Sequence, residues 1–285
     1  MTAETSSRLQ ELSRISTFAF SETAFGGRIF SAHSPPQLST SKRDQEIASG
    51  LPENLDALPQ LDGFRLRGIE MTRLETFIDA AFAFAVTMMV IAAERVPDNI
   101  ITLLAAFKNA PAFVAGIAVL GIFWRGHWKW SRRYGLEDGV SIFISWVLLV
   151  TILMYIYPLK ALFGSMFYLL SDGRLGQTLG MRSVTQVRAI LAIYATGFAA
   201  IAIEIVLLNL RAWRLREPLR LNARERFLTR ADMTGWSIPA TVGIIALVLA
   251  LTLPADYLGW SGWIYSSLAV LVPVHKRFLR RRRRD

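Results

Sequence analysis

A long apolar run in this chain carries two polar groups whose positions need a chemical explanation. The run Arg73–Ile91 opens with charged side chains, among them Asp79, and then continues without a charge until Glu94. Thr87 lies deep inside the uncharged part. A polar group in hydrocarbon is costly unless it faces protein or water. A carboxylate at the mouth of such a run could pair with a cation or carry a proton, and a hydroxyl inside it could replace part of an ion's hydration shell.

The arrangement of side chains around this run allows two interpretations. At about 100° per residue, four bulky apolar residues share one stripe, with Thr87 on its flank: Phe77, Phe84, Met88 and Ile91. Asp79 points roughly the opposite way. The run is either a packing helix, whose Thr87 bonds back to its own backbone carbonyls, or a pore-lining helix. In the second case, its apolar residues form constrictions and its hydroxyls form a ring around an axis.

Two further titratable side chains lie in or beside apolar stretches. His127 is near the end of the second stretch, at the depth that Arg73 and Asp79 occupy in the first. It is either an interfacial residue or part of a charged network that ties the two helices together. Glu204 lies inside a later apolar stretch, where a carboxylate is a functional candidate by default. We expect it to pair with an arginine of the 211–230 loop, and proton transfer is the alternative.

The sequence shows no residues arranged for enzyme catalysis. It contains no nucleophile triad, no phosphate-binding loop and no cluster of metal ligands, and it has only three histidines and no cysteine. Without cysteine there is neither a disulfide framework nor a thiolate metal site. We therefore predict no catalytic residues, no metal site and no cofactor, and we do not expect an enzyme.

The elements that position these residues are those of a membrane protein. The chain has 285 residues, of which 53% are hydrophobic and only 19% charged, and the charges are clumped. This profile is typical of a chain with several membrane spans and not of a soluble domain. Long uncharged stretches predict an all-α fold with six transmembrane helices. Their approximate limits are 72–93, 100–130 (with an uninterrupted apolar core at 110–124), 140–162, 189–210, 236–253 and 258–274.

The chain divides into three regions. Residues 1–64 are rich in Ser, Pro and charge and contain no long apolar run, so we predict a disordered cytosolic extension. Residues 65–275 form the six-helix transmembrane domain. Residues 276–285 form a polybasic tail, which includes five consecutive arginines from Arg280 to Arg284. Such a tail next to a span contacts anionic lipid or sets topology more often than it binds nucleic acid, so no nucleic-acid partner is predicted.

Basic residues also predict the orientation. In the six-span scheme, 18 basic residues fall in the tail and in the loops on its side, and six fall in the opposite loops. Loops rich in Lys and Arg stay in the cytoplasm. We therefore expect a multi-pass protein of the cell membrane with both termini in the cytoplasm.

Two short motifs resemble a known family. The first is Arg73-x-x-x-Phe77-Ile78-Asp79, which is similar to the RxxxFSD signature that opens the first helix of the transmembrane protein 175 family. The nine residues 82–90, FAFAVTMMV, resemble the FAIAITLLV run of that family without a gap. Two positions depart from the pattern, because Ile78 replaces Ser and Phe84 replaces Ile or Leu. The second motif is Trp124-x-x-His127, which resembles the W-x-x-H at the end of the family's second span.

This family comprises potassium channels of lysosomes and prokaryotes, so the resemblance implies a potassium-selective channel. One copy has a single candidate pore helix, and the prokaryotic family implies a homotetramer in the lipid bilayer, with K⁺ as the permeant ion. The resemblance places apolar constrictions at Phe84, Met88 and Ile91 and the selectivity-determining hydroxyl at Thr87. Selectivity does not come from a carbonyl cage, since no TVGYG-like filter is present. The expected structural network behind the pore helix contains Arg73, Phe77, Asp79, Trp124 and His127.

Two other functions compete with the channel. A proton-conducting or proton-coupled transport protein would use Glu204 and Asp79 as relay groups. A membrane anchor without transport would bind lipid or a partner through its basic tail and its N-terminal extension. The first alternative requires a titrating group at Glu204. The second predicts that no ion flux occurs and that deleting the termini removes the function.

Overall fold

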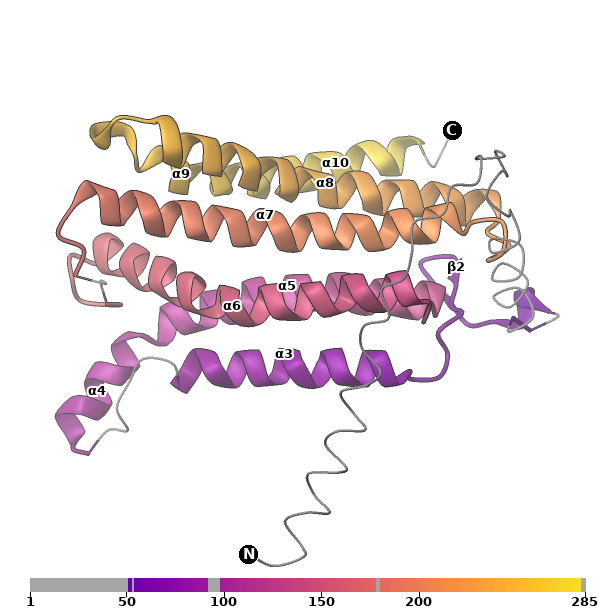
Figure 1. Ribbon diagram of the computed structural model, residues 1–285, viewed down its shortest axis with the longest axis horizontal. Helices are drawn as coiled ribbons and strands as arrows, with labels where there is room; N and C mark the ends of the chain where they lie inside the picture. Colours follow the sequence, from indigo (N-terminus) through magenta and orange to yellow (C-terminus); the bar gives the residue numbers. More distant parts are fainter. Residues whose placement is uncertain (1–50, 53, 92–97, 178–179, 283–285) are drawn as a thin grey trace, which may run out of the picture. The chain divides into compact units, whose positions relative to one another are not determined.

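The computed structural model describes residues 51–52, 54–91, 98–177 and 180–282. The described chain is almost entirely helical (Figure 1). Its long helices are α3 (Arg73–Ile91), α5 (Ala110–Tyr134), α6 (Gly139–Leu170), α7 (Val184–Arg214) and α8 (Ala223–Thr252). Its short helices are η2 (Leu55–Ala57), α4 (Ile100–Lys108), η3 (Ala255–Tyr257), α9 (Trp260–Trp263), η4 (Ile264–Ser267) and α10 (Leu268–Arg282). Before α3, strands β1 (Gln60–Leu61) and β2 (Phe64–Arg65) form a small antiparallel hairpin.

The long helices run side by side, and successive helices alternate in direction (Figure 1). Among the described residues, four helices are long and apolar enough to cross a membrane: α5, α6, α7 and α8. The shorter α3 has three charged residues in its first seven. The prediction of an all-helical membrane protein is confirmed, because each long helix is apolar over most of its length. The predicted number of six spans is a separate matter.

Local signals set several helix limits. The side chains of Asp138, Ser183 and Asn222 accept hydrogen bonds from the first backbone N–H groups of α6, α7 and α8. These residue types satisfy N–H groups that have no partner inside the helix. Helix α5 is capped after Tyr134 by Gly135, whose φ of 58° is left-handed, and a Cβ atom there would lie 3.1 Å from a backbone atom of Arg67. Glycine thus allows the segment before α3 to cross the end of α5 closely.

Two helices are longer than predicted. Helix α6 continues to Leu170, so Gly164–Leu170 is helical and not part of the following loop. Helix α8 begins at Ala223, well before the predicted start at Trp236, because Asn222 and Glu225 form a reciprocal capping box there. Much of the expected 211–230 loop is therefore helical.

The predicted sixth span is not one continuous helix. Residues 255–282 form η3, α9, η4 and α10 in succession. This stretch contains two glycines, Gly259 and Gly262, and helix propensity is low for glycine. The predicted domain boundary at residue 64 falls inside the β1–β2 hairpin, whose Phe64 is fully buried. Residues 1–50 lie outside the described part of the chain.

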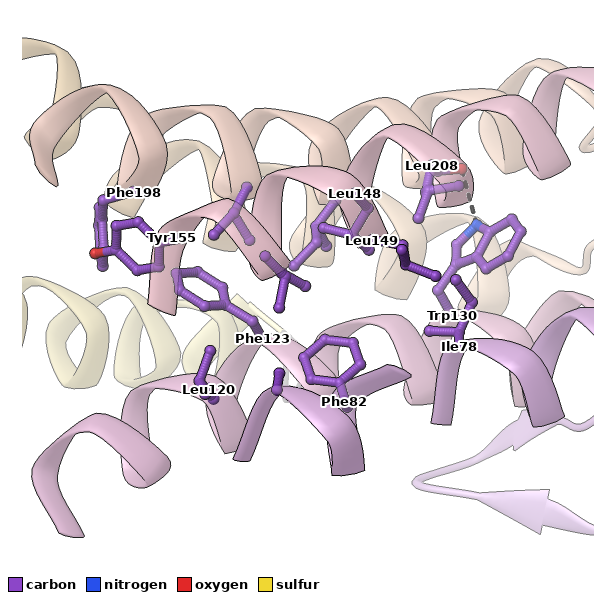
Figure 2. Close-up of a cluster of buried hydrophobic side chains, with 14 of the residues drawn as sticks. Ile78, Phe82, Leu120, Phe123, Trp130, Leu148, Leu149, Tyr155, Phe198 and Leu208 are labelled. Atoms are coloured by element: carbon purple, nitrogen blue, oxygen red, sulfur yellow. Dashed lines mark hydrogen bonds between the residues drawn. The ribbon is translucent and has the colours of Figure 1, made fainter. Parts of the chain in front are cut away.

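The core lies between α3, α5, α6 and α7 (Figure 2). Phe123 of α5 packs edge-on against Phe198 of α7, with 5.5 Å between ring centroids. The Trp130 indole N–H donates to the Leu208 carbonyl oxygen at 2.8 Å, drawn as a dashed line in Figure 2. Ile78 and Phe82 of α3 reach into the same cluster. The first predicted span is therefore packed on the bundle along one of its faces only.

Candidate functional site

Helix α3 has a buried face and an exposed face. The buried face consists of apolar residues that are at most 6% exposed: Ile78, Phe82, Ala85 and Met89. On the other side, Phe77 is 47% exposed, Phe84 is 56% exposed and Val90 is 53% exposed. Exposed positions recur every three or four residues along the helix, which is the period of one helical face. Phe77 contacts α6, but from Phe84 to Val90 an apolar face of α3 is left without a partner among the described residues of one chain.

The structure describes the side chains of three of the four residues expected to line a pore. Phe84 and Thr87 are exposed. The Thr87 hydroxyl donates to the Ala83 carbonyl oxygen at 3.0 Å, which leaves the lone pairs of the Thr87 oxygen available on the exposed side. Met88 is partly buried against the core. Ile91 ends the helix, and its side chain lies outside the described part.

Two members of the expected network, Asp79 and Trp124, are brought together. The Trp124 indole N–H donates to Asp79 Oδ1 at 2.8 Å. This bond links α3 to α5 and gives the carboxylate a partner at the start of the apolar run. Phe77 of α3 packs against Trp146 of α6, with 5.4 Å between ring centroids.

The other two members, His127 and Arg73, have different surroundings. His127 is buried and its Nε2 lies 3.2 Å from Ser145 Oγ, so it connects α5 to α6 and not to α3. Arg73 is exposed and has no ion pair within the described residues. The structure therefore does not bring Arg73, Asp79 and His127 into one hydrogen-bonded group.

A buried acid that the sequence analysis did not single out, Glu75, fixes the start of α3. The Arg132 Nε lies 3.0 Å from Glu75 Oε1, and the Glu75 side chain is 1% exposed. The Arg132 guanidinium also donates to the carbonyl oxygens of Gly68 and Ile69, at 3.1 Å and 3.0 Å. One arginine of α5 thus holds both the first turn of α3 and the segment before it. The sequence did contain a pattern that could have drawn attention to Glu75. It lies four residues before Asp79, so the two acids share one helical face.

The hairpin before α3 is tied to α8 by a second buried ion-pair group. Glu225 is completely buried and lies 3.0 Å from a guanidinium nitrogen of Arg65 and 3.0 Å from one of Arg67. The hydrogen bond to Glu225 raises the pKa of Arg65, so this guanidinium stays charged. The Phe64 ring lies under the Arg133 guanidinium, 4.6 Å from its central carbon. These contacts hold the chain that leads into α3 against the beginning of α8.

Helices α5 and α8 are joined at the same end by a shared carboxylate. Asp232 of α8 pairs with Lys129 at 2.7 Å and also with Arg133, both on α5. The hairpin, the C-terminal ends of α5 and α7 and the beginning of α8 all meet here (Figure 1). We call this the basic end of the bundle.

Glu204 does not have the arginine partner that we expected. The Thr151 hydroxyl of α6 lies 2.7 Å from Glu204 Oε1, and no arginine contacts this carboxyl group in the described chain. The second oxygen, Oε2, is buried and has no described hydrogen-bond partner. The prediction that an arginine pairs with Glu204 was wrong. Thr151 of α6 lies beside this turn of α7 at the depth of the carboxyl group, and the arginines of the 211–230 segment make their hydrogen bonds to other groups.

The comparisons with known proteins concern the part of the chain that contains α3. Residues 73–155 match a family model described as endosomal/lysosomal potassium channel TMEM175. A curated protein of Marivirga tractuosa, named potassium channel, is 29% identical over 198 residues, which are 67% of this chain and 79% of that protein. A crystal structure of a variant of the potassium channel MtTMEM175, bound to a nanobody–MBP fusion protein, has a TM-score of 0.68 and 28% identity, and the match covers 80% of this chain and 100% of that chain. The chain is similar to TMEM175 potassium channels, and its match to the family model covers α3 and the segments that follow it up to residue 155.

These matches confirm the predicted resemblance to the TMEM175 family. A further crystal structure, of a lysosomal potassium-selective channel TMEM175 homolog from Chamaesiphon minutus, has a TM-score of 0.50 at 20% identity, with 71% of this chain and 95% of that chain covered. This second match supports the fold alone. The TMEM175 family model covers α3, α4, α5 and the first part of α6. The exposed face of α3 and its supports from α5 and α6 therefore lie inside the matched region.

Proposed function

We propose that this protein is a potassium-selective channel whose pore is lined by α3. The observation that carries the proposal is the continuous exposed face of α3, opposite a face that is buried on α5 and α6. One helix can cover only one side of an ion path, so several chains must surround the axis. We infer a homotetramer, in line with the family resemblance, with K⁺ as the permeant ion and no cofactor.

In this proposal, the residues of the exposed face have separate roles. Phe84, Met88 and Ile91 form apolar constrictions that close the path by excluding water. Thr87 lies one turn after Ala83, to which it is bonded, and supplies a ring of hydroxyl oxygens between the constrictions. These oxygens replace part of the hydration shell of the ion.

The residues behind the exposed face hold α3 in place. Asp79 and Trp124 connect α3 to α5, and His127 with Ser145 connects α5 to α6. Phe77 packs on α6 through Trp146. Arg73, which we expected to hold the pore helix as well, is exposed at the start of α3. These contacts fix the position of the pore helix, and none of them needs to touch the ion.

The proposed topology has six crossings, with the broken segment 255–282 as the last. The basic end of the bundle faces the cytoplasm, because segments rich in Lys and Arg stay on the cytoplasmic side of the membrane. Both termini then lie on the cytoplasmic side of the cell membrane.

Flux measurements in liposomes that hold the purified protein test this proposal. We expect potassium flux to exceed sodium flux, and we expect Thr87→Ala to abolish that preference. Thr196→Ala is the matched control, because Thr196 is also exposed and bonds back to a carbonyl four residues earlier, at 2.8 Å on α7. If both variants lose the preference for potassium over sodium, or if neither loses it, Thr87 is not the selectivity residue. Absence of all flux from a folded oligomer would refute an open channel.

Proton conduction is the second candidate function, and the observation that favours it is the unpartnered Oε2 of Glu204. A relay needs a titrating group there, whereas the potassium channel does not. Glu204→Gln keeps the shape of the side chain and removes the titration. A pH-driven flux that disappears in this variant while potassium flux persists would assign proton transport to Glu204. An unchanged proton flux would exclude that role.

A further inference from the structure

Helices α8 and α10 lie side by side at the basic end, and a histidine joins them. His275 Nε2 of α10 lies 3.2 Å from Thr234 Oγ1 and 3.5 Å from the Ala231 carbonyl oxygen, both on α8. The two helices run in opposite directions (Figure 1). The residues after His275 therefore pass alongside the turn of α8 that precedes Thr234. Arg230 lies in that turn, one helical turn before Thr234 and on the same face.

Exposed cations of both helices follow or precede this contact closely along the chain. The exposed members of the group are Arg230 of α8 and Lys276, Arg277 and Arg281 of α10. The Arg230 guanidinium also lies over the Trp213 ring of α7, 4.3 Å from its centroid. We call these residues, with Trp213, the α8–α10 basic cluster.

The cluster has no carboxylate partner in the described structure, because nearby acids are already paired. From residue 205 to residue 282 the sequence has four acids. Glu217 pairs with Arg216 and Arg226, and the buried Glu225 and the partly buried Asp232 pair with the arginines and the lysine described above. The fourth, Asp256, lies in η3, at the far end of α8. None of these cations forms an ion pair with a carboxylate within the described part of the chain.

Exposed apolar side chains lie next to these cations. Val274 is 54% exposed and Phe278 is 53% exposed, and both belong to the same helix as Lys276 and Arg277. Anionic headgroups meet acyl chains at the surface of a membrane leaflet, and basic pockets between transmembrane helices bind such headgroups. A nucleic acid would need the charge but not the adjacent apolar surface.

We propose that the α8–α10 basic cluster binds the headgroup of an anionic phospholipid from the leaflet at the basic end. The cations contact the phosphate groups, and Val274 and Phe278 contact the acyl chains. The proposal does not depend on which ion the protein conducts.

Lipid retention by the full-length protein tests the proposal. The protein is purified in detergent, exchanged into nanodiscs of nine parts phosphatidylcholine to one part phosphatidylglycerol, and the lipids bound after re-extraction are counted by native mass spectrometry. The test variant is Arg230→Gln/Lys276→Gln/Arg277→Gln. Since one basic residue near an anionic surface contributes about a fivefold change in binding, we expect on the order of a hundredfold loss of retained phosphatidylglycerol.

The matched control is Arg125→Gln/Arg220→Gln/Arg224→Gln, which removes the same charge from exposed positions at the same end. Retention that is close to wild type in the control and lost in the test variant supports the cluster. An equal loss of retained phosphatidylglycerol in both variants would show a general attraction between charges and would overturn the proposed site. Wild-type protein that retains a 20-nucleotide single strand in place of phosphatidylglycerol would assign the cluster to nucleic acid.

A charge-preserving variant covers the case in which the triple variant does not fold. Arg230→Lys/Arg277→Lys keeps every positive charge, so we expect it to retain phosphatidylglycerol within about a fewfold of wild type. If this variant is folded by size-exclusion chromatography and retains no more phosphatidylglycerol than phosphatidylcholine, the proposed headgroup site is refuted.

Discussion

The two ends of the helix bundle are held together by different interactions. At the basic end, buried and partly buried ion pairs connect the hairpin, α3, α5 and α8, with Glu75, Glu225 and Asp232 as the central acids. At the opposite end, Arg188 of α7 donates to the Ala250 and Leu253 carbonyl oxygens at the end of α8, at 2.6 Å and 2.7 Å. There α4 exposes all of its large apolar side chains. Helix α3 is therefore fixed at its charged start, while its second half is held mainly by apolar packing.

The largest effect is expected from breaking the buried group at the basic end. Glu225→Ala leaves two guanidinium groups, those of Arg65 and Arg67, without their main partner, and removal of one side of a buried ion pair costs about 3–5 kcal/mol. We expect the free energy of unfolding in detergent to fall by that amount. Glu217→Ala is the control, because Glu217 is 66% exposed and such pairs contribute at most about 1 kcal/mol. Similar losses in both variants would contradict the difference between buried and exposed pairs.

A smaller effect is expected on the buried face of α3. Phe82→Ala should lower the free energy of unfolding by about 2–4 kcal/mol, somewhat less than in a soluble core, because lipid also solvates apolar side chains. Phe84→Ala, two residues away on the exposed face, should change stability by no more than about 0.5 kcal/mol and should increase potassium flux. A stability loss at Phe84 as large as at Phe82 would show that the exposed face is packed in the assembled protein.

A further decrease in stability is expected at the opposite end. Arg188→Met removes the donors to two carbonyl oxygens and keeps most of the side-chain volume. Hydrogen bonds to a charged group contribute about 1.5–3 kcal/mol, so we expect a loss of about 2 kcal/mol in a denaturant titration. Arg182→Met, an exposed arginine just before α7, is the control and should have no measurable effect. Equal stability of the two variants would show that this cap does not hold α7 to α8.

The smallest effect concerns pH and Asp138, the N-cap of α6. Burial by itself would raise the pKa of Asp138, but hydrogen bonds from Ser141 and Arg211 outweigh it and hold this pKa below its ordinary value. The stabilisation is therefore present above the unfolded-state pKa of about 4 and is lost as the pH falls through the lower folded-state pKa. We expect Asp138→Asn to remove on the order of 1 kcal/mol at neutral pH and to flatten the acid limb of the stability profile. An unchanged acid limb would contradict this assignment.

The sequence predicted what depends on local pattern. The limits of α3 and the start of α5 follow from charge and hydropathy, and the link between Asp79 and Trp124 lies within motifs that were recognised. The sequence did not predict contacts made across long separations. Glu225 lies 160 residues from Arg65, and nothing in either segment identifies the other as its partner. The extension of α8 also depended on a local signal, the capping box at Asn222, which the hydropathy pattern alone overlooks.

The separation between the hairpin and Glu225 has a consequence for biosynthesis. Arg65 and Arg67 leave the ribosome 160 and 158 residues before Glu225 does. At about 5–20 residues per second, translation of that interval takes roughly 8–32 seconds. During this time α3, α5, α6 and α7 can enter the membrane while two arginines of the hairpin lack their carboxylate. The hairpin is thus fastened to α8 only after most of the chain has been synthesised, so in a nascent chain that stops before α8 the contacts of Arg132 of α5 hold the start of α3 without the support of Glu225.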